Sequence, residues 1–187
     1  MIDEHDKYAS VGNDGRLMIF YRESMMPCEN IQVGQTEVTD VCNLRSLNRI
    51  ATGSRDGHVT FFDATNYGRQ KDFLKYNSPV TAIAYSKDFG SYHFAVGLES
   101  GHLFIYAEFR PSSVSHGKMS GPQMELPRHS GAITRVAFVP EIQALATSSM
   151  DGSLKTTHVV TGSELRSFTP FEKVRTAHTH TPAASTA

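Results

Sequence analysis

The sequence predicts an all-β protein made of four copies of one small unit, and three observations support this. Four segments repeat the same order of apolar strand, tight turn and apolar strand, and their turn glycines Gly15, Gly57, Gly101 and Gly152 lie 42, 44 and 51 residues apart. Aromatic and β-branched residues flank these turns without a sustained helical period. The chain has 187 residues, 39% of them hydrophobic and 20% charged, which suits one compact domain or part of a larger one.

Each unit centres on a predicted hairpin. Asp-Gly is the preferred pair for a tight turn that needs positive φ, and apolar strand formers such as residues 17–20 and 59–62 flank the turns. The same pairs could suggest calcium loops or catalytic carboxylates, but the backbone geometry of the turn explains them. The expected turn residues are Asp14, Gly15, Asp56, Gly57, Gly101 and Gly152.

A further strand is expected before three of the hairpins, and a weaker one after three of them. The expected inner strands are residues 38–42, 80–85 and 133–138, and the expected outer strands are residues 31–33, 72–74 and 164–168. The hairpin repeats therefore lie near residues 8–21, 38–63, 80–107 and 132–158. Four strands in each 42 to 51 residues is typical of a propeller blade. The first hairpin begins at Tyr8, so the first blade is expected to lack a strand.

The last repeat, residues 129–152, resembles a WD40 repeat without a gap. The resemblance implies a partial WD40-type β-propeller with about four blades of antiparallel four-stranded sheet. It also implies a structural hydrogen bond between His129, before the inner strand, and Asp151 in the turn, with Thr147 as the strand hydroxyl of the same network. Thr157 stands where the family has a Trp.

The other repeats depart from the family pattern at these positions. Gly34 and Tyr76 stand at the position of His129, and the Trp positions hold Phe20, Phe62 and Tyr106. The repeats are therefore degenerate, and the resemblance rests on the period and the hairpin pattern.

Residues 1–171 are expected to form the propeller arc. Within it, residues 108–127 are rich in Pro, Ser and Gly and are expected to form a polar loop. Residues 172–187 lack the apolar content to pack and are expected to be a disordered tail. Four blades suit an open arc with exposed faces. A partial or truncated propeller is the favoured interpretation, and self-assembly of two arcs is the second.

The charge balance and the cysteines disfavour several classes of protein. Lys and Arg number 18 against 19 Asp and Glu, so a net charge of −1 gives no broad attraction for nucleic acids or anionic membranes. Cys28 and Cys42 lack C-x-x-C spacing, and a disulfide scaffold is not expected. The polar residues 1–6 and the lack of a long apolar run predict neither export nor a membrane span. A cytoplasmic or nuclear location is expected.

The sequence holds no G-x-S-x-G, Walker-type, H-E-x-x-H or C-x-x-C motif. We therefore expect no enzyme activity, no cofactor and no metal site. His129 with Asp151 is interpreted as the structural bond of the family rather than as a catalytic dyad. His178 and His180 supply too few fixed ligands for a metal ion.

The candidate partner-binding residues are basic side chains at the turns. Arg16, His58 and His102 each follow a turn glycine, and Arg55 precedes the second turn, so equivalent blades would place all four near one rim. The competing interpretation is that they only solvate the turn tips. The leading expectation is a non-catalytic protein–protein interaction scaffold or a subunit of a multiprotein complex. The alternative is a reader of a modified or acidic peptide, or of nucleic acid, through this basic rim. Expected partners are other proteins, including a chain that completes the propeller or a second copy.

Overall fold

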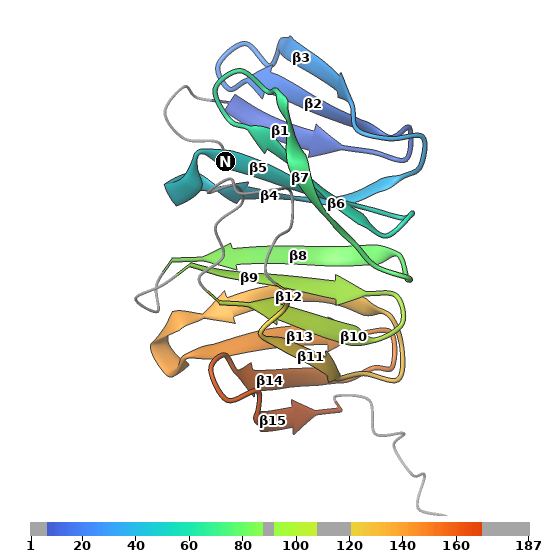
Figure 1. Ribbon diagram of the computed structural model, residues 1–187, viewed down its shortest axis with the longest axis vertical. Coiled ribbons are helices and arrows are strands. Elements are labelled where there is room, and N and C mark those ends of the chain that lie inside the picture. The colour runs from blue at the N-terminus through green and yellow to red at the C-terminus, as the bar shows by residue number, and fades with distance from the viewer. Residues whose placement is uncertain (1–6, 88–91, 108–120, 170–187) are drawn as a thin grey trace, which may run out of the picture.

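The computed structural model describes residues 7–87, 92–107 and 121–169, and these form four antiparallel sheets with two short 3-10 helices (Figure 1). Each sheet is a meander whose strands pair in chain order, the first with three strands and the others with four. We call the sheets blades 1 to 4 in chain order. Within the described ranges the fold is all-β and the first blade has three strands instead of four, as the sequence predicts. Among the described residues no helix has the length and apolar character needed to cross a membrane.

The strands of each blade follow one another closely along the chain. Blade 1 contains β1 (Lys7–Val11), β2 (Arg16–Tyr21) and β3 (Pro27–Gln32). Blade 2 contains β4 (Val38–Leu44), β5 (Arg49–Ser54), β6 (His58–Asp63) and β7 (Arg69–Lys75). Blade 3 contains β8 (Val80–Ser86), β9 (His93–Leu98), β10 (His102–Tyr106) and β11 (Met124–Pro127). Blade 4 contains β12 (Ile133–Val139), β13 (Ala144–Ser149), β14 (Leu154–His158) and β15 (Glu164–Phe168). The helices η1 (Arg45–Leu47) and η2 (Pro140–Ile142) join the first two strands of blades 2 and 4.

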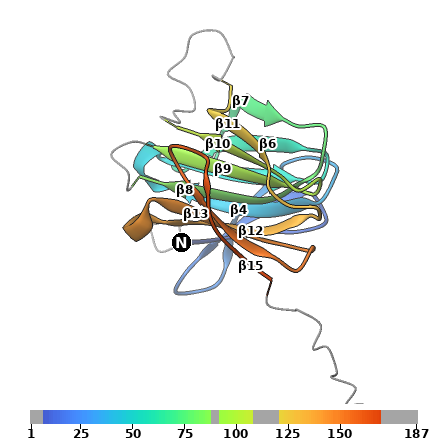
Figure 2. The same ribbon diagram turned by 90° about the horizontal axis from the view of Figure 1, so that it is seen from below.

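The blades stack in chain order through their first strands. β4 packs beside β1 and β8, and β8 packs beside β12 (Figure 1). Figure 2 views this stack from below and shows the outer strands β7 and β15 on opposite sides of it. Blades 1 and 4 are therefore the two ends of an arc.

A β-bulge recurs near the start of each inner strand. The pairing register passes over Thr39 in β4, Thr81 in β8 and Thr134 in β12. The hydroxyls of Thr39 and Thr81 donate to the carbonyl oxygens of Gly53 and Gly97, each at 3.0 Å. Thr39 also lies 2.7 Å from the carbonyl oxygen of Val80 in the next blade. The apolar-Thr pair that opens each inner strand thus marks a repeated structural feature.

Apolar side chains form one core between each pair of neighbouring blades. The core between blades 1 and 2 contains Leu17, Ile19, Val38, Ile50 and Phe62. The core between blades 2 and 3 includes Val59, Phe61, Val80, Phe94 and Val96, and the core between blades 3 and 4 includes Ala95, Leu103, Ile105, Ile133 and Leu145. Successive residues of a strand face opposite sides, so a middle blade contributes to two cores. All six residues of β9 are consequently buried, whereas all five residues of β15 are exposed.

The expectation of a polar loop over residues 108–127 is wrong for its last four residues. These form β11, which pairs with β10 as the outer strand of blade 3. Met124 and Leu126 lie on one face of this strand and pack against the core between blades 3 and 4. The strands β3 and β7 are also longer than the segments 31–33 and 72–74 expected from the sequence. Residues 108–120, and the expected tail 172–187 with His178 and His180, lie outside the described residues.

Candidate functional site

The tight turns and the links between blades lie at one end of the sheets, and we call this end the turn rim. It comprises the turns 12–15, 54–57, 98–101 and 149–152 and the links 33–37, 76–79 and 128–132. Each turn is closed by a backbone hydrogen bond from its glycine, with lengths between 3.0 and 3.3 Å. The helices η1 and η2 lie at the opposite end of the sheets, at the left of Figure 1.

Each of the first three turns is covered by the link that follows its blade. The N–H of Tyr76 donates to the carbonyl oxygen of Gly57 at 2.9 Å, and the N–H of His129 donates to that of Gly101 at 3.1 Å. These glycines have φ of +84° and +81°, and a Cβ at either position would overlap the carbonyl oxygen of the covering residue. At Gly152 no described residue lies within 4 Å of the corresponding Cβ position.

His129 anchors the link before blade 4 through three side-chain contacts. Its Nδ1 lies 3.2 Å from Asp151 Oδ2 and 3.0 Å from Ser153 Oγ, and its Nε2 lies 2.8 Å from Thr147 Oγ1. The N–H of Ser130 also donates to Asp151 Oδ2 at 3.0 Å. The structure therefore brings His129, Asp151 and Thr147 together and adds Ser153, the residue after Gly152, which was not among the predicted site residues.

Burial and hydrogen bonding set the charges in this network. Burial lowers the pKa of His129 below its ordinary value, which outweighs the opposite effect of the neighbouring Asp151. Burial alone would raise the pKa of Asp151, but hydrogen bonds from Ser153 and Ser130 hold it well below its ordinary range. A neutral imidazole beside a carboxylate is therefore the favoured state of the pair near neutral pH.

The network has the order of a catalytic triad, with a hydroxyl, an imidazole and a carboxylate in a row. Thr147 is only 1% exposed and the side chain of His129 is 0% exposed, so a substrate cannot reach the hydroxyl. What the arrangement does is hold the link 128–132 against the turn of blade 4.

The His129 network is not repeated in blades 2 and 3. In blade 3, Tyr76 and Tyr106 occupy the His and Trp positions, and their hydroxyl oxygens lie 2.7 Å apart in a buried contact. In blade 2, Gly34 offers no side chain, and Asp56 instead accepts a hydrogen bond from Ser54 Oγ at 2.5 Å within its own turn. The degenerate positions 76 and 106 thus carry a contact of their own, whereas position 34 carries none from a side chain.

Of the four predicted partner-binding residues, Arg55 lies in the turn rim, and Arg16, His58 and His102 directly follow its turns, but each has an acidic or polar neighbour. Arg55 lies 3.6 Å from Glu37 and 3.7 Å from Glu99, a pairing that joins blades 2 and 3. Arg16 lies 3.9 Å from Asp14, and His58 Nδ1 lies 3.1 Å from Asp56. The charges of Arg55 and Arg16 therefore have acidic partners nearby. His102 Nδ1 lies 3.2 Å from Ser100 Oγ.

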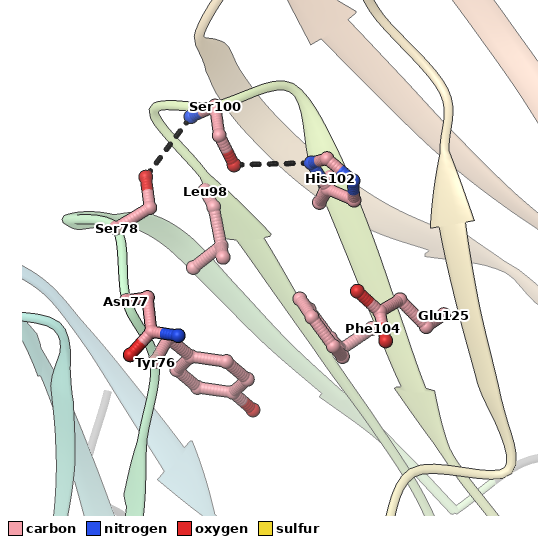
Figure 3. A pocket seen from close by; sticks show the side chains of 8 residues that line it. All are labelled: Tyr76, Asn77, Ser78, Leu98, Ser100, His102, Phe104 and Glu125. Atoms are coloured by element: carbon pink, nitrogen blue, oxygen red, sulfur yellow. Dashed lines mark hydrogen bonds between the residues drawn. The ribbon is translucent and has the colours of Figure 1, made fainter.

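His102 also borders a pocket that sequence reasoning did not find (Figure 3). The pocket has a volume of about 240 Å³ and lies between the link 76–79 and the strands β9, β10 and β11. Its lining residues are Tyr76, Asn77, Ser78, Leu98, Ser100, His102, Phe104 and Glu125. The ring centroids of Tyr76 and Phe104 are 4.7 Å apart. The departure from His at position 76 was a visible signal, but Glu125 lies in a strand that the sequence did not predict.

Within the described ranges, no group of three or more His, Cys, Asp or Glu side chains is placed to hold a metal ion. Cys28 and Cys42 are free thiols. Burial raises the pKa of the Cys42 thiol to about 12, so this side chain stays protonated and is a poor nucleophile at neutral pH.

Two segments of the chain match a known protein family. The family model described as WD domain, G-beta repeat, matches residues 27–63 and 120–156. Each match begins at or just before the outer strand of one blade and ends in the third strand of the next, so it spans a link of the turn rim. No curated protein matches the chain.

Two solved structures share the fold. The chain aligns with a crystal structure of the mitotic checkpoint complex at a TM-score of 0.72 with 22% identity, covering 87% of this chain. It aligns with a crystal structure of the computationally designed Ika8 protein at a TM-score of 0.68 with 19% identity, covering 89% of this chain. The chain spans 47% of the length of each of these neighbours. At these identities the likeness concerns the fold alone.

Proposed function

Because this chain is built from degenerate WD40 repeats, we propose that it acts as a non-catalytic protein-interaction scaffold or as a subunit of a multiprotein complex. The turn rim is the observation that supports this proposal. Three links are bonded onto three turns, so loops from neighbouring blades are held in fixed positions. Loops that are already ordered lose little conformational freedom when a partner docks on them.

An acidic peptide or a nucleic acid fits this rim less well than the sequence suggests. Arg55 is flanked by Glu37 and Glu99, and Arg16 and His58 each face an aspartate. Exposed pairs of this kind contribute only about 0–1 kcal/mol each, but they leave little uncompensated positive charge for a ligand. A reducing compartment, the cytoplasm or the nucleus, belongs to the proposal because both cysteines are free thiols.

The partners that we propose include one that covers the open face of blade 4. The residue two positions after each turn glycine is apolar, and Leu17, Val59 and Leu103 are 0% exposed in the cores between blades. The equivalent Leu154 in blade 4 is 39% exposed. We infer that a further blade, from a second copy or from another chain, covers this face. The aligned part of this chain covers 47% of each neighbouring structure, so two such parts would cover nearly the whole length of either neighbour.

Affinity capture with the tagged full chain, followed by mass spectrometry, tests the proposed function. We expect a reproducible set of captured proteins that Arg16→Glu at the turn rim reduces. Lys87→Glu makes the same charge change after β8, at the opposite end of the sheets, and should leave the set intact. A chain that captures no protein above background contradicts the scaffold function. If both variants reduce the capture of partners equally, the partners do not bind at the turn rim.

A further inference from the structure

We propose that the pocket in Figure 3 binds an arginine side chain of a partner protein, with Glu125 as the carboxylate that faces the guanidinium. The inference rests on the proposed interaction function and specifies the chemistry of one contact within it. In Figure 3 the side chain of Glu125 extends from β11 toward Phe104, opposite the link that carries Tyr76 and Asn77. The volume of about 240 Å³ suits one side chain better than a drug-sized ligand.

Glu125 gives the pocket its charge. Within the part of the chain that the structure describes, no cation pairs with this carboxylate. Two basic side chains in or beside the turn rim have other partners: Arg55 contacts Glu37 and Glu99, and Lys75, at the end of β7, contacts the carbonyl oxygen of Asp56. An exposed carboxylate in a pocket attracts a cationic group and repels an acidic one.

The aromatic rings beside Glu125 favour arginine over lysine. The hydroxyl of Tyr76 contacts that of Tyr106, and the Tyr76 ring is only 8% exposed, so it offers a guanidinium little free face. The ring of Phe104, tilted at 48° to that of Tyr76, is half-buried and offers the more accessible face. A guanidinium is planar and weakly hydrated, so it stacks on aromatic faces while its edge bonds a carboxylate. An ammonium group is compact and strongly hydrated and gains less from such surroundings.

The mouth of the pocket offers hydrogen-bond acceptors for the remaining guanidinium donors. The N–H of Ser100 donates to Ser78 Oγ at 3.1 Å, and Ser100 Oγ contacts His102 Nδ1, so both hydroxyl groups are held in place (Figure 3). The side-chain amide of Asn77 lies at the same mouth. A guanidinium carries five N–H donors, which this set of oxygens can accept together with Glu125. Leu98 supplies the apolar wall against which the methylene stem packs.

A titration of the isotope-labelled full chain, followed by NMR, tests the proposal with N-acetylarginine amide as the probe and N-acetylcitrulline amide as its uncharged counterpart. We expect saturable shifts of the amide resonances of residues 76–78 and 99–104 with arginine, and roughly tenfold weaker binding of citrulline. Glu125→Gln should weaken arginine binding by a similar factor. Phe104→Leu keeps the apolar bulk and should weaken it roughly two- to fivefold.

Glu141→Gln is the matched control, since it removes the same charge in η2 at the opposite end of the sheets. It should bind arginine as the parent chain does. Equal binding of arginine and citrulline, unchanged binding by Glu125→Gln, or no saturable shift at these residues would overturn the proposal. The outcome is separable from the capture experiment, because captured partners that ignore Glu125→Gln leave the scaffold function standing without this contact. If the chain binds arginine but captures no partner protein, the pocket is supported and the scaffold function is not.

Discussion

His129 contacts three side chains with one ring, and each of them comes from a different part of blade 4. Removing the ring leaves Thr147 and Ser153 without this partner, and removing Asp151 leaves the ring and the N–H of Ser130 short of an acceptor. Leaving a buried polar group unpaired costs more than the net gain from forming the bond. The stability of this junction is therefore sensitive to single substitutions.

We predict that His129→Ala and Asp151→Ala each lower the free energy of unfolding by about 1–3 kcal/mol. Urea denaturation followed by circular dichroism measures this change. Ser130→Ala is the control, because the backbone N–H of Ser130 makes the stronger contact with Asp151 and its hydroxyl only a weak one at 3.5 Å. Unfolding curves of the two alanine variants that superimpose on that of the parent would show that the network does not stabilise the fold.

The same network predicts how stability depends on pH. Burial lowers the pKa of His129 below its ordinary value of 6.5, so the unfolded chain takes up this proton at a higher pH than the folded chain does. Stability should therefore fall as the pH drops below about 6.5. The pKa of Asp151 is also lowered, from an ordinary value of 3.8, and its contribution is lost on further acidification.

Urea midpoints measured between pH 7 and pH 5 should fall for the parent chain and fall less for His129→Gln, which cannot take up the proton. The difference between the two slopes isolates His129 from the other histidines. Parallel slopes for both proteins would exclude this titration as a source of pH dependence.

At the scale of elements, the contact between a turn and the following link can be tested with a pair of glycines. Gly57 and Gly152 have φ of +84° and +81°, so alanine is strained by about 1–2 kcal/mol at either position. At Gly57 a Cβ would also overlap the carbonyl oxygen of Tyr76, whereas at Gly152 no described residue lies within 4 Å.

We therefore predict that Gly57→Ala destabilises the chain clearly more than Gly152→Ala does. Thermal unfolding of the two variants beside the parent measures both losses. Equal losses would mean that the link does not press on the turn of blade 2, or that another segment covers the turn of blade 4.

The hairpins could be predicted because their signals are local. An Asp-Gly or Ser-Gly turn with apolar flanks sets its own backbone geometry, and β6 and β10 lie where these flanks place them. The outer strand β11 could not be predicted in this way. It has only four residues, and Met124 and Leu126 give just two apolar positions in alternation. The segment before it is rich in Pro, Ser and Gly, which favours a loop. The strand is stabilised by packing against the core between blades 3 and 4, whose residues are mostly distant from it in the sequence.

The site shows the same division. The positions of His129 and Asp151 followed from the repeat, but the pairing of Tyr76 with Tyr106 depends on two degenerate positions whose side chains meet only in the folded blade. The sequence also placed Arg55 at the rim without showing the two glutamates beside it, because Glu37 lies in the link before blade 2 and Glu99 in the turn of blade 3. The net charge around a rim residue depends on which turns and links lie beside it in the folded chain, and a single repeat does not show this.

At the scale of the whole molecule, the two ends of the arc differ from its middle. The middle blades are covered on both faces, whereas among the described residues of blade 4 the side chains of β15 are exposed, and Leu154 and Phe168 are 39% and 48% exposed. Burial of apolar surface contributes about 25 cal/mol per Å². A second blade on this face would therefore gain the stabilisation that the three cores between blades already provide.

Sedimentation velocity of the purified full chain over a range of concentrations tests this account most directly. The variant Leu154→Glu is measured beside the parent chain, because it places a charge in the face that a further blade would cover. We predict that the parent chain sediments as an assembly larger than its 20.6 kDa, either with itself or with a co-purified partner, and that Leu154→Glu shifts it toward a folded monomer. Val160→Glu, at a position that is 57% exposed in a turn, should leave the assembly unchanged. A parent chain that stays a stable, folded monomer of 20.6 kDa at every concentration would contradict the account.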